Sequence, residues 1–81
     1  MNRPTLDDVV ETMGEVVDLL DVVVTEECVL GEDIAIDSQQ MLRVLSRLES
    51  RYRMRFAPDV ILRLNTVGDL LEALSRAAGG R

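Results

Sequence analysis

Ser38, which directly follows Asp37, is the first of the few residues in this chain that could do chemistry. A serine hydroxyl at an exposed helix start is within reach of another enzyme, and the unpaired backbone amides there favour a phosphate group. A serine or aspartate in such a position is, however, more often a plain helix cap than a modified residue. Taken alone, these two residues leave both interpretations open.

The other candidate groups favour structural roles. The chain has no histidine, so the commonest general base and the commonest metal ligand are both missing. Cys28 is the single cysteine and is expected to be a small buried apolar residue. Glu32 and Asp33 could bind a cation, but two adjacent carboxylates usually mark a solvated turn. No nucleophile with a neighbouring base is evident, which argues against an enzyme.

Helical periodicity predicts the element that begins the chain. Apolar residues recur at spacings of three and four from Leu6 to Leu20, and Thr5 with Asp8 forms a capping box in front of them. The helical pattern then breaks, and residues 21–37 are predicted to form a long ordered loop. Its expected anchors are the apolar residues Val24, Cys28, Leu30, Ile34 and Ile36.

Three further helices are predicted in the second half. One begins near Asp37 or Ser38 and fades after about Arg53, a short turn spans 58–64, and a capping box at 66–69 opens the last helix. Residues 78–81 are expected to fray. The prediction is an all-α four-helix bundle, with three main helices and one short one, and a long loop after the first helix. At 81 residues, the chain is expected to be a single domain, 1–81.

Three segments resemble the acyl carrier proteins, the small four-helix carriers of fatty-acid and polyketide synthesis. Residues 32–38, Glu-Asp-Ile-Ala-Ile-Asp-Ser, are similar to the family's modification site, with Ile for Leu and Ala for Gly. Residues 48–52 resemble the family's Leu-Glu-x-x-Phe, and residues 66–70 resemble the start of its fourth helix. The likeness runs from about Thr5 to Leu74, with the order and spacing preserved.

The resemblance implies a specific function. Ser38 would be esterified by 4′-phosphopantetheine from coenzyme A, delivered by a phosphopantetheinyl transferase, and Asp37 would help to engage that enzyme and its metal. The thiol of the arm would carry acyl or polyketide-type intermediates as thioesters between acyl-loading and acyl-processing enzymes. An aminoacyl or peptidyl cargo is a variant of this function. The chain itself would be a modified phosphoprotein that catalyses nothing.

The chain departs from the family around the site. Gln39 stands where the family usually has an apolar residue, and Arg43 and Arg47 stand in a helix that is typically acidic. We expect Gln39, Leu42, Arg43 and Arg47 to contact partner enzymes. The reversed charge favours a specialised carrier over the housekeeping fatty-acid carrier, because charge complementarity selects partners. Gln39 also keeps open an unmodified helical docking module with the same fold.

Charge and hydropathy argue against nucleic acids and membranes as binding partners. Residues 1–37 hold eleven acids and one base, whereas residues 38–81 hold four acids and eight arginines, for a net charge of −6. An acidic balance argues against nucleic acid, although five arginines between positions 43 and 55 keep that alternative open. No apolar run approaches a membrane span, and the first residues lead into acidic sequence, so we expect no signal segment before the first helix. A monomeric cytoplasmic protein is expected.

Overall fold

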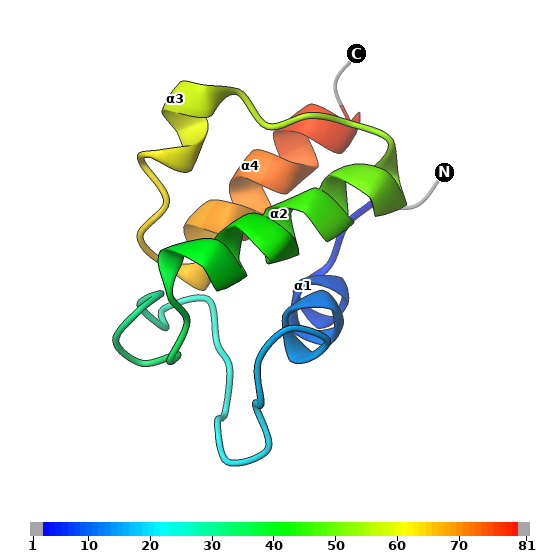
Figure 1. Ribbon diagram of the computed structural model, residues 1–81. Helices are drawn as coiled ribbons and strands as arrows, with labels where there is room; N and C mark the ends of the chain where they lie inside the picture. The colour runs from blue at the N-terminus through cyan, green and yellow to red at the C-terminus, as the bar shows by residue number, and fades with distance from the viewer. Residues whose placement is uncertain (1–2, 80–81) are drawn as a thin grey trace.

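The computed structural model describes residues 3–79, and every regular element in that range is a helix (Figure 1). The four elements are α1 (Leu6–Gly14), α2 (Ser38–Tyr52), α3 (Pro58–Ile61) and α4 (Val67–Gly79). The predicted bundle of three main helices and one short helix, with a long loop after the first, is confirmed.

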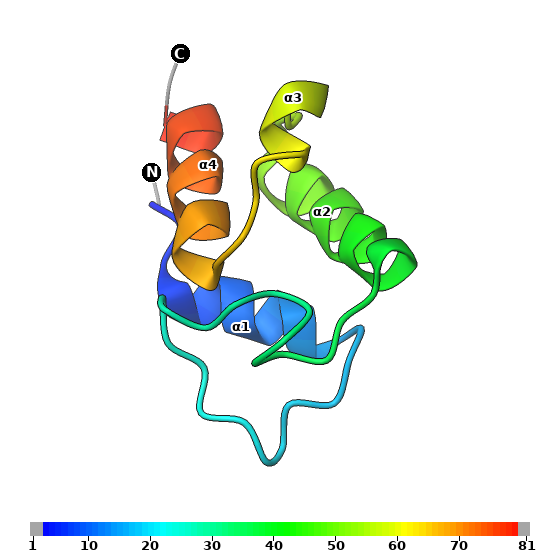
Figure 2. The same cartoon turned by 90° about the vertical axis from the view of Figure 1, so that its left-hand side faces the viewer.

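The helices surround one core. α1 lies crosswise at one end of the molecule and contacts both α2 and α4, and α3 lies at the opposite end (Figures 1 and 2). Apolar side chains from all three main helices and from the long loop meet between them. The buried apolar residues are Val9, Met13, Val17, Ile34, Val44, Leu45, Leu48, Phe56, Val67, Leu70 and Leu74.

α1 is shorter than its periodicity predicts. The helix ends at Gly14, and the prediction that it continues to Leu20 is wrong. β-branched Val16 and Val17 are poor helix formers, and the Asp18 carboxylate accepts a hydrogen bond from the Leu20 amide at 2.9 Å, which stabilises a turn instead. Val17 is still buried, whereas Leu20 is 90% exposed. The apolar spacing therefore predicts which side chains are buried as far as Val17, but it does not predict where the helical backbone ends.

The loop that follows runs from residue 15 to residue 37 and is fixed against the start of α4. The amides of Val67 and Gly68 donate to the carbonyls of Cys28 and Glu26 at 2.9 Å each, so first-turn amides of α4 find their partners in the loop. A Cβ at Gly68 would lie 3.1 Å from the Glu26 carbonyl oxygen, and glycine permits this close approach. All five predicted anchors contact the core, with Ile34 fully buried.

The ends of the other helices follow local chemistry. The predicted capping box of α4 is present, since the Asp69 amide donates to Thr66 Oγ1 at 3.1 Å and the Thr66 amide donates to Asp69 Oδ2 at 3.0 Å. α2 ends at Tyr52, and its C-cap is Arg53, whose φ of 54° is left-handed. α4 continues through Ala78 to Gly79, where fraying is predicted, and residues 80 and 81 lie outside the described range.

Candidate functional site

Ser38 is the first residue of α2, and its side chain is exposed. Asp37 precedes it as the N-cap: its Oδ1 accepts from the Gln40 amide at 2.8 Å, and its own amide donates to Gln40 Oε1 at 2.9 Å. This reciprocal capping box fixes the direction in which the chain enters α2. Asp37 is therefore a helix cap, and this cap leaves the Ser38 hydroxyl at the surface.

Two amides beside the hydroxyl remain available. Within residues 3–79, the backbone N–H groups of Ser38 and Gln39 have no hydrogen-bond partner, whereas those of Gln40 and Met41 bond to Asp37. Free amides at the positive end of a helix bind phosphate oxygens well. A phosphate ester on Ser38 therefore fits the donors that surround it.

The chain leading into the site is held by a tight turn. Gly31, with a φ of +89°, donates its amide to the Ile34 carbonyl at 2.9 Å, and Asp33 Oδ2 accepts from the Val29 amide at 2.8 Å. The left-handed φ is one that glycine adopts at little cost. Ile34 then enters the core with no exposed surface. Asp37 and Ser38 thus follow a segment that is anchored from inside.

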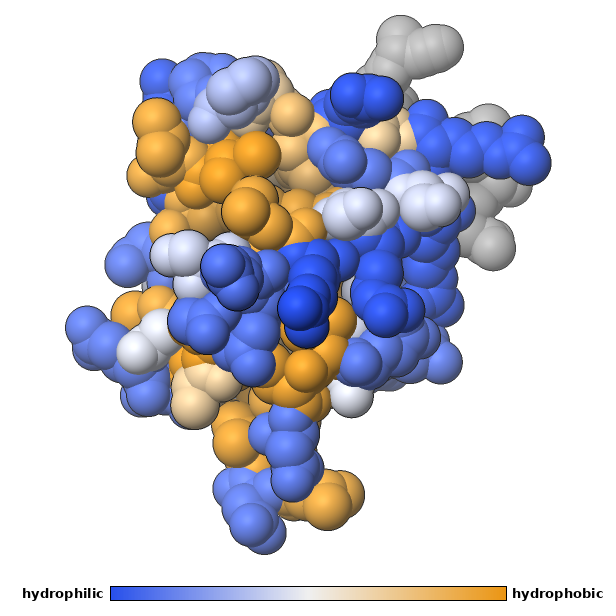
Figure 3. All heavy atoms as spheres, in the orientation of Figure 1, coloured by the Kyte–Doolittle hydropathy of each residue, from blue (hydrophilic) through white to orange (hydrophobic). Residues whose placement is uncertain are grey.

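An apolar groove begins at Ser38 and runs between the start of α2 and the segment that contains α3. Its volume is about 440 Å³. Apart from Asp37 and Ser38, its lining is hydrocarbon or thioether: Leu30, Ile36, Met41, Leu42, Leu45, Ile61, Leu62 and Leu64. Figure 3 shows hydrophobic atoms gathered over α3 and between α3 and the start of α2. Met41 and Leu45 of α2 line one part of the groove, and Ile61 and Leu64 from the segment around α3 line another.

The sequence missed part of this groove. Leu62, which is 87% exposed, lines it together with Leu42, which is 56% exposed. Leu30 and Ile36 are predicted as core anchors, yet they also line the groove. The sequence gives little indication of the role of Leu62. It directly follows a one-turn helix, which is too short to show a periodic pattern of apolar residues.

The four residues expected to contact partners do not share one environment. Gln39, Leu42 and Arg43 are exposed on the outer side of α2. Arg47 instead lies toward α1 and forms an ion pair with Glu15 at 3.1 Å. Its side chain keeps 54% of its surface exposed, so it lies at the edge between the outer side of α2 and α1.

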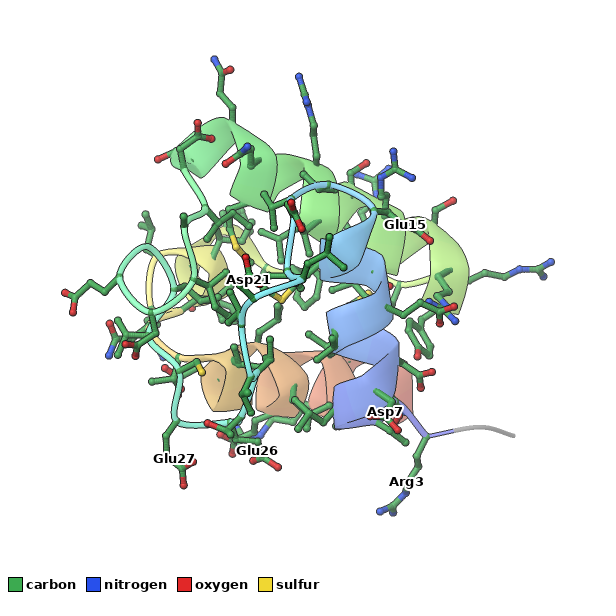
Figure 4. The ribbon with its side chains drawn as sticks, turned by 90° about the horizontal axis from the view of Figure 1, so that it is seen from below. Arg3, Asp7, Glu15, Asp21, Glu26 and Glu27 are labelled. Atoms are coloured by element: carbon green, nitrogen blue, oxygen red, sulfur yellow. The ribbon has the colours of Figure 1, made fainter. Side chains whose placement is uncertain are left out.

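A cluster of charged residues joins α1 to α2. Arg51 Nη2 lies 3.0 Å from Glu11 Oε1, and Arg51 Nη1 donates to the buried Thr12 Oγ1 at 3.0 Å. The hydrogen bond with Glu11 raises the pKa of Arg51 further above its usual range. We call the set Glu11, Thr12, Glu15, Arg47 and Arg51 the α1–α2 clamp. In Figure 4, Glu15 lies at the end of α1 that faces α2.

The cysteine and the acidic residues considered as possible reactive groups or metal ligands do not form a further site. The thiol of Cys28 accepts from the Thr25 amide at 3.3 Å and contacts the Val23 carbonyl at 3.6 Å, which stabilises the loop. Among residues 3–79, no group of three or more His, Cys, Asp or Glu side chains could hold a metal ion. Over the same range, every helix is too short or too polar to span a membrane.

A family model matches most of the chain. The family described as the phosphopantetheine attachment site matches residues 7–74, which is most of the chain and includes the predicted site. Searches of curated proteins and of solved structures gave no significant match.

Proposed function

Because the chain belongs to the phosphopantetheine attachment site family, we propose that it is an acyl carrier protein that bears its 4′-phosphopantetheine arm on Ser38. The observation that carries the assignment is the position of this hydroxyl. It is exposed at the first residue of α2, beside two free amides and at the mouth of an apolar groove. When bound, the arm supplies the thiol that holds the acyl group as a thioester.

The free backbone amides make Ser38 a better attachment site for a phosphate ester than the other serines of α2. Ser46 and Ser50 are also exposed on α2, but they lie inside the helix, where backbone amides are engaged. At Ser38, the amides of Ser38 and Gln39 and the positive end of α2 would stabilise the phosphate ester. Asp37 holds this helix start and adds a carboxylate that would help a transferase to engage its metal ion.

The groove favours an apolar cargo. Beyond Asp37 and Ser38, its lining offers no side-chain hydrogen-bond donor or acceptor other than the weakly accepting sulfur of Met41. An aliphatic acyl or reduced polyketide chain would gain from leaving water there, whereas a free amino group would lose hydration without finding a partner. We therefore rank acyl or polyketide-type intermediates above an aminoacyl or peptidyl cargo.

The rest of the assignment follows from the carrier role. Residues 1–81 would act as one carrier unit that catalyses no step, and catalysis would belong to the phosphopantetheinyl transferase and to acyl-loading and acyl-processing enzymes. The unusual arginines of α2 favour a dedicated pathway over housekeeping fatty-acid synthesis. We place this pathway in the cytoplasm as part of the same proposal. Standard fatty-acid enzymes should therefore process the loaded protein poorly, and turnover equal to that of a housekeeping carrier would reject this specialisation.

The direct test is an intact mass. We expect the protein incubated with coenzyme A and a broad-specificity phosphopantetheinyl transferase to gain one phosphopantetheine unit. Ser38→Ala should gain none, and Ser46→Ala, a matched control on the same helix, should gain one unit. Circular dichroism would verify that each variant is folded. Modification of Ser38→Ala would show that another residue is the attachment site.

Gln39 supports one alternative function. It is exposed directly after Ser38, where the family usually has an apolar residue that partner enzymes contact. A folded protein that gains no mass with several transferases would instead be an unmodified docking module. Gln39→Leu would then separate the two cases, because restored modification would identify Gln39 as the block.

A further inference from the structure

The outer side of α2 carries a continuous exposed stripe from Ser38 to the end of the helix. Its residues recur at helical spacing and are all exposed. We call this set, which ends at the C-cap residue, the outward α2 stripe: Gln39, Leu42, Arg43, Ser46, Ser50 and Arg53. It contains one large apolar side chain, two arginines and no carboxylate.

The structure divides the arginines of α2 and its C-cap residue, Arg53, into two groups. Arg47 and Arg51 are partly neutralised, because both bond to carboxylates of α1 in the α1–α2 clamp. Among residues 3–79, Arg43 and Arg53 have no carboxylate within 4.0 Å. Their positive charges are therefore available to a partner.

The single carboxylate of α2 does not cancel these charges fully. Glu49 is only partly exposed, and its Oε2 accepts a hydrogen bond from the Phe56 amide at 3.0 Å. Arg55 adds a further positive charge near Arg53. The two arginines line the same shallow hollow at the end of α2. Figure 3 shows strongly hydrophilic atoms along α2, next to the hydrophobic atoms near α3.

The acidic residues lie mainly elsewhere. In Figure 4, Asp7 of α1, its C-cap residue Glu15, and Asp21, Glu26 and Glu27 of the loop lie on the side of the molecule seen from below. The net charge of −6 therefore does not describe the outward α2 stripe, although the exposed Asp37 carboxylate lies directly before Ser38. An enzyme that reaches the Ser38 hydroxyl lies over the start of the outward α2 stripe and meets Leu42 and Arg43 there.

We propose that the enzymes that act on this carrier dock on the outward α2 stripe through a surface with carboxylates opposite Arg43 and Arg53 and an apolar recess for Leu42. This inference rests on the proposed function, since Ser38 is what brings an enzyme to this face. Opposite charges steer the approach, and burial of an exposed leucine adds affinity at the centre of the contact.

A nucleic acid is the other polyanion that the stripe could meet. The α1–α2 clamp engages two of the five arginines between positions 43 and 55, and the molecule as a whole is acidic. Phosphate backbones also offer no recess for Leu42. These observations favour an acidic protein surface.

The test uses two phosphopantetheinyl transferases of known structure, one with an acidic and one with a basic surface around its active site. We expect Arg43→Glu and Arg53→Glu each to lower kcat/KM about tenfold with the acidic enzyme and to raise it with the basic one. Arg76→Glu is the matched control, because it makes the same charge change on α4, and it should change neither rate. Higher salt should weaken the wild-type preference for the acidic enzyme.

The outcomes separate this inference from the function on which it rests. Modification of Ser38 with unchanged efficiency in both stripe variants overturns the docking surface alone. If neither enzyme modifies the folded wild-type protein, the proposed function fails and the docking surface fails with it. Binding of a DNA duplex at low salt, abolished by the same two substitutions, would assign the stripe to nucleic acid instead.

Discussion

At the scale of single residues, the orientation of the candidate site depends on a side chain four positions before Ser38. Ile34 has no exposed surface and ties the loop to the core. We expect Ile34→Ala to lower the free energy of unfolding by about 2–4 kcal/mol, because it removes buried methyl groups and leaves a cavity. Urea denaturation would measure this loss.

Val23→Ala provides the control for that experiment. Val23 lies in the same loop but is 85% exposed, so its truncation should change stability by less than about 0.5 kcal/mol. Equal losses in the two variants would mean that the loop is not anchored through Ile34. A second readout is the rate at which Ser38 is modified, which should fall in Ile34→Ala under conditions where the protein remains folded.

The residues of the site were predictable to different degrees. Asp37 and Gln40 form a capping box across only three positions, so the helix start at Ser38 could be predicted from local sequence. The groove could be predicted only in part, because Leu30, Leu42 and Leu62 come from separate segments that meet only in the folded chain. Whether Arg43 and Arg47 have internal partners also depends on tertiary structure.

At the scale of elements, α1 shows where periodicity misleads. Apolar spacing reports which residues are buried, and a turn can present the same side chains to the core as a helix does. Val16, Val17 and Leu19 contact the core or lie within it although the helix ends at Gly14. The caps of α1, α2 and α4 were predictable because each depends on a pair of residues three positions apart.

Two glycines in these elements should respond differently to alanine. A Cβ at Gly14 meets nothing within 4 Å, so Gly14→Ala should raise the free energy of unfolding by about 0.5–1 kcal/mol through helix propensity. A Cβ at Gly68 would press on the backbone of Glu26, which should cancel that gain or reverse it. Thermal unfolding of both variants would compare them, and equal stabilisation would show that the loop yields freely at Gly68.

At the scale of the whole molecule, the α1–α2 clamp links the acidic first half of the chain to the arginine-rich second half. We expect Arg51→Ala to lower Tm, because it removes the ion pair with Glu11 and leaves the buried Thr12 hydroxyl without one of its partners. Arg43→Ala, which removes an unpaired arginine from the same helix, should change Tm little. The difference should narrow in about 1 M sodium chloride, where salt screens the pair. If the difference in Tm between the two variants does not change with salt, the lower Tm of Arg51→Ala results from lost packing rather than from the lost ion pair.

Acid should weaken the fold through its capping carboxylates. Hydrogen bonds from the backbone amides of Thr66 and Asn65 lower the pKa of Asp69. The folded state therefore binds fewer protons than the unfolded state, and the stability that Asp69 contributes is present above about pH 4 and lost as the pH falls through its lowered value. Urea midpoints measured from about pH 6 to pH 2 should decline less steeply in Asp69→Asn, and parallel curves would contradict this role.

The ultraviolet absorbance of Tyr52 can report on the contact between α1 and α2. It is the single tyrosine, and the chain has no tryptophan. Its ring contacts the core, where burial and the neighbouring Asp8 carboxylate raise the pKa of the phenol. Separation of α1 from α2 would expose the ring and allow tyrosinate absorbance to develop at a lower pH. The protein thus contains its own chromophore for following, without a label, whether its first helix stays in place as cargo or an enzyme binds.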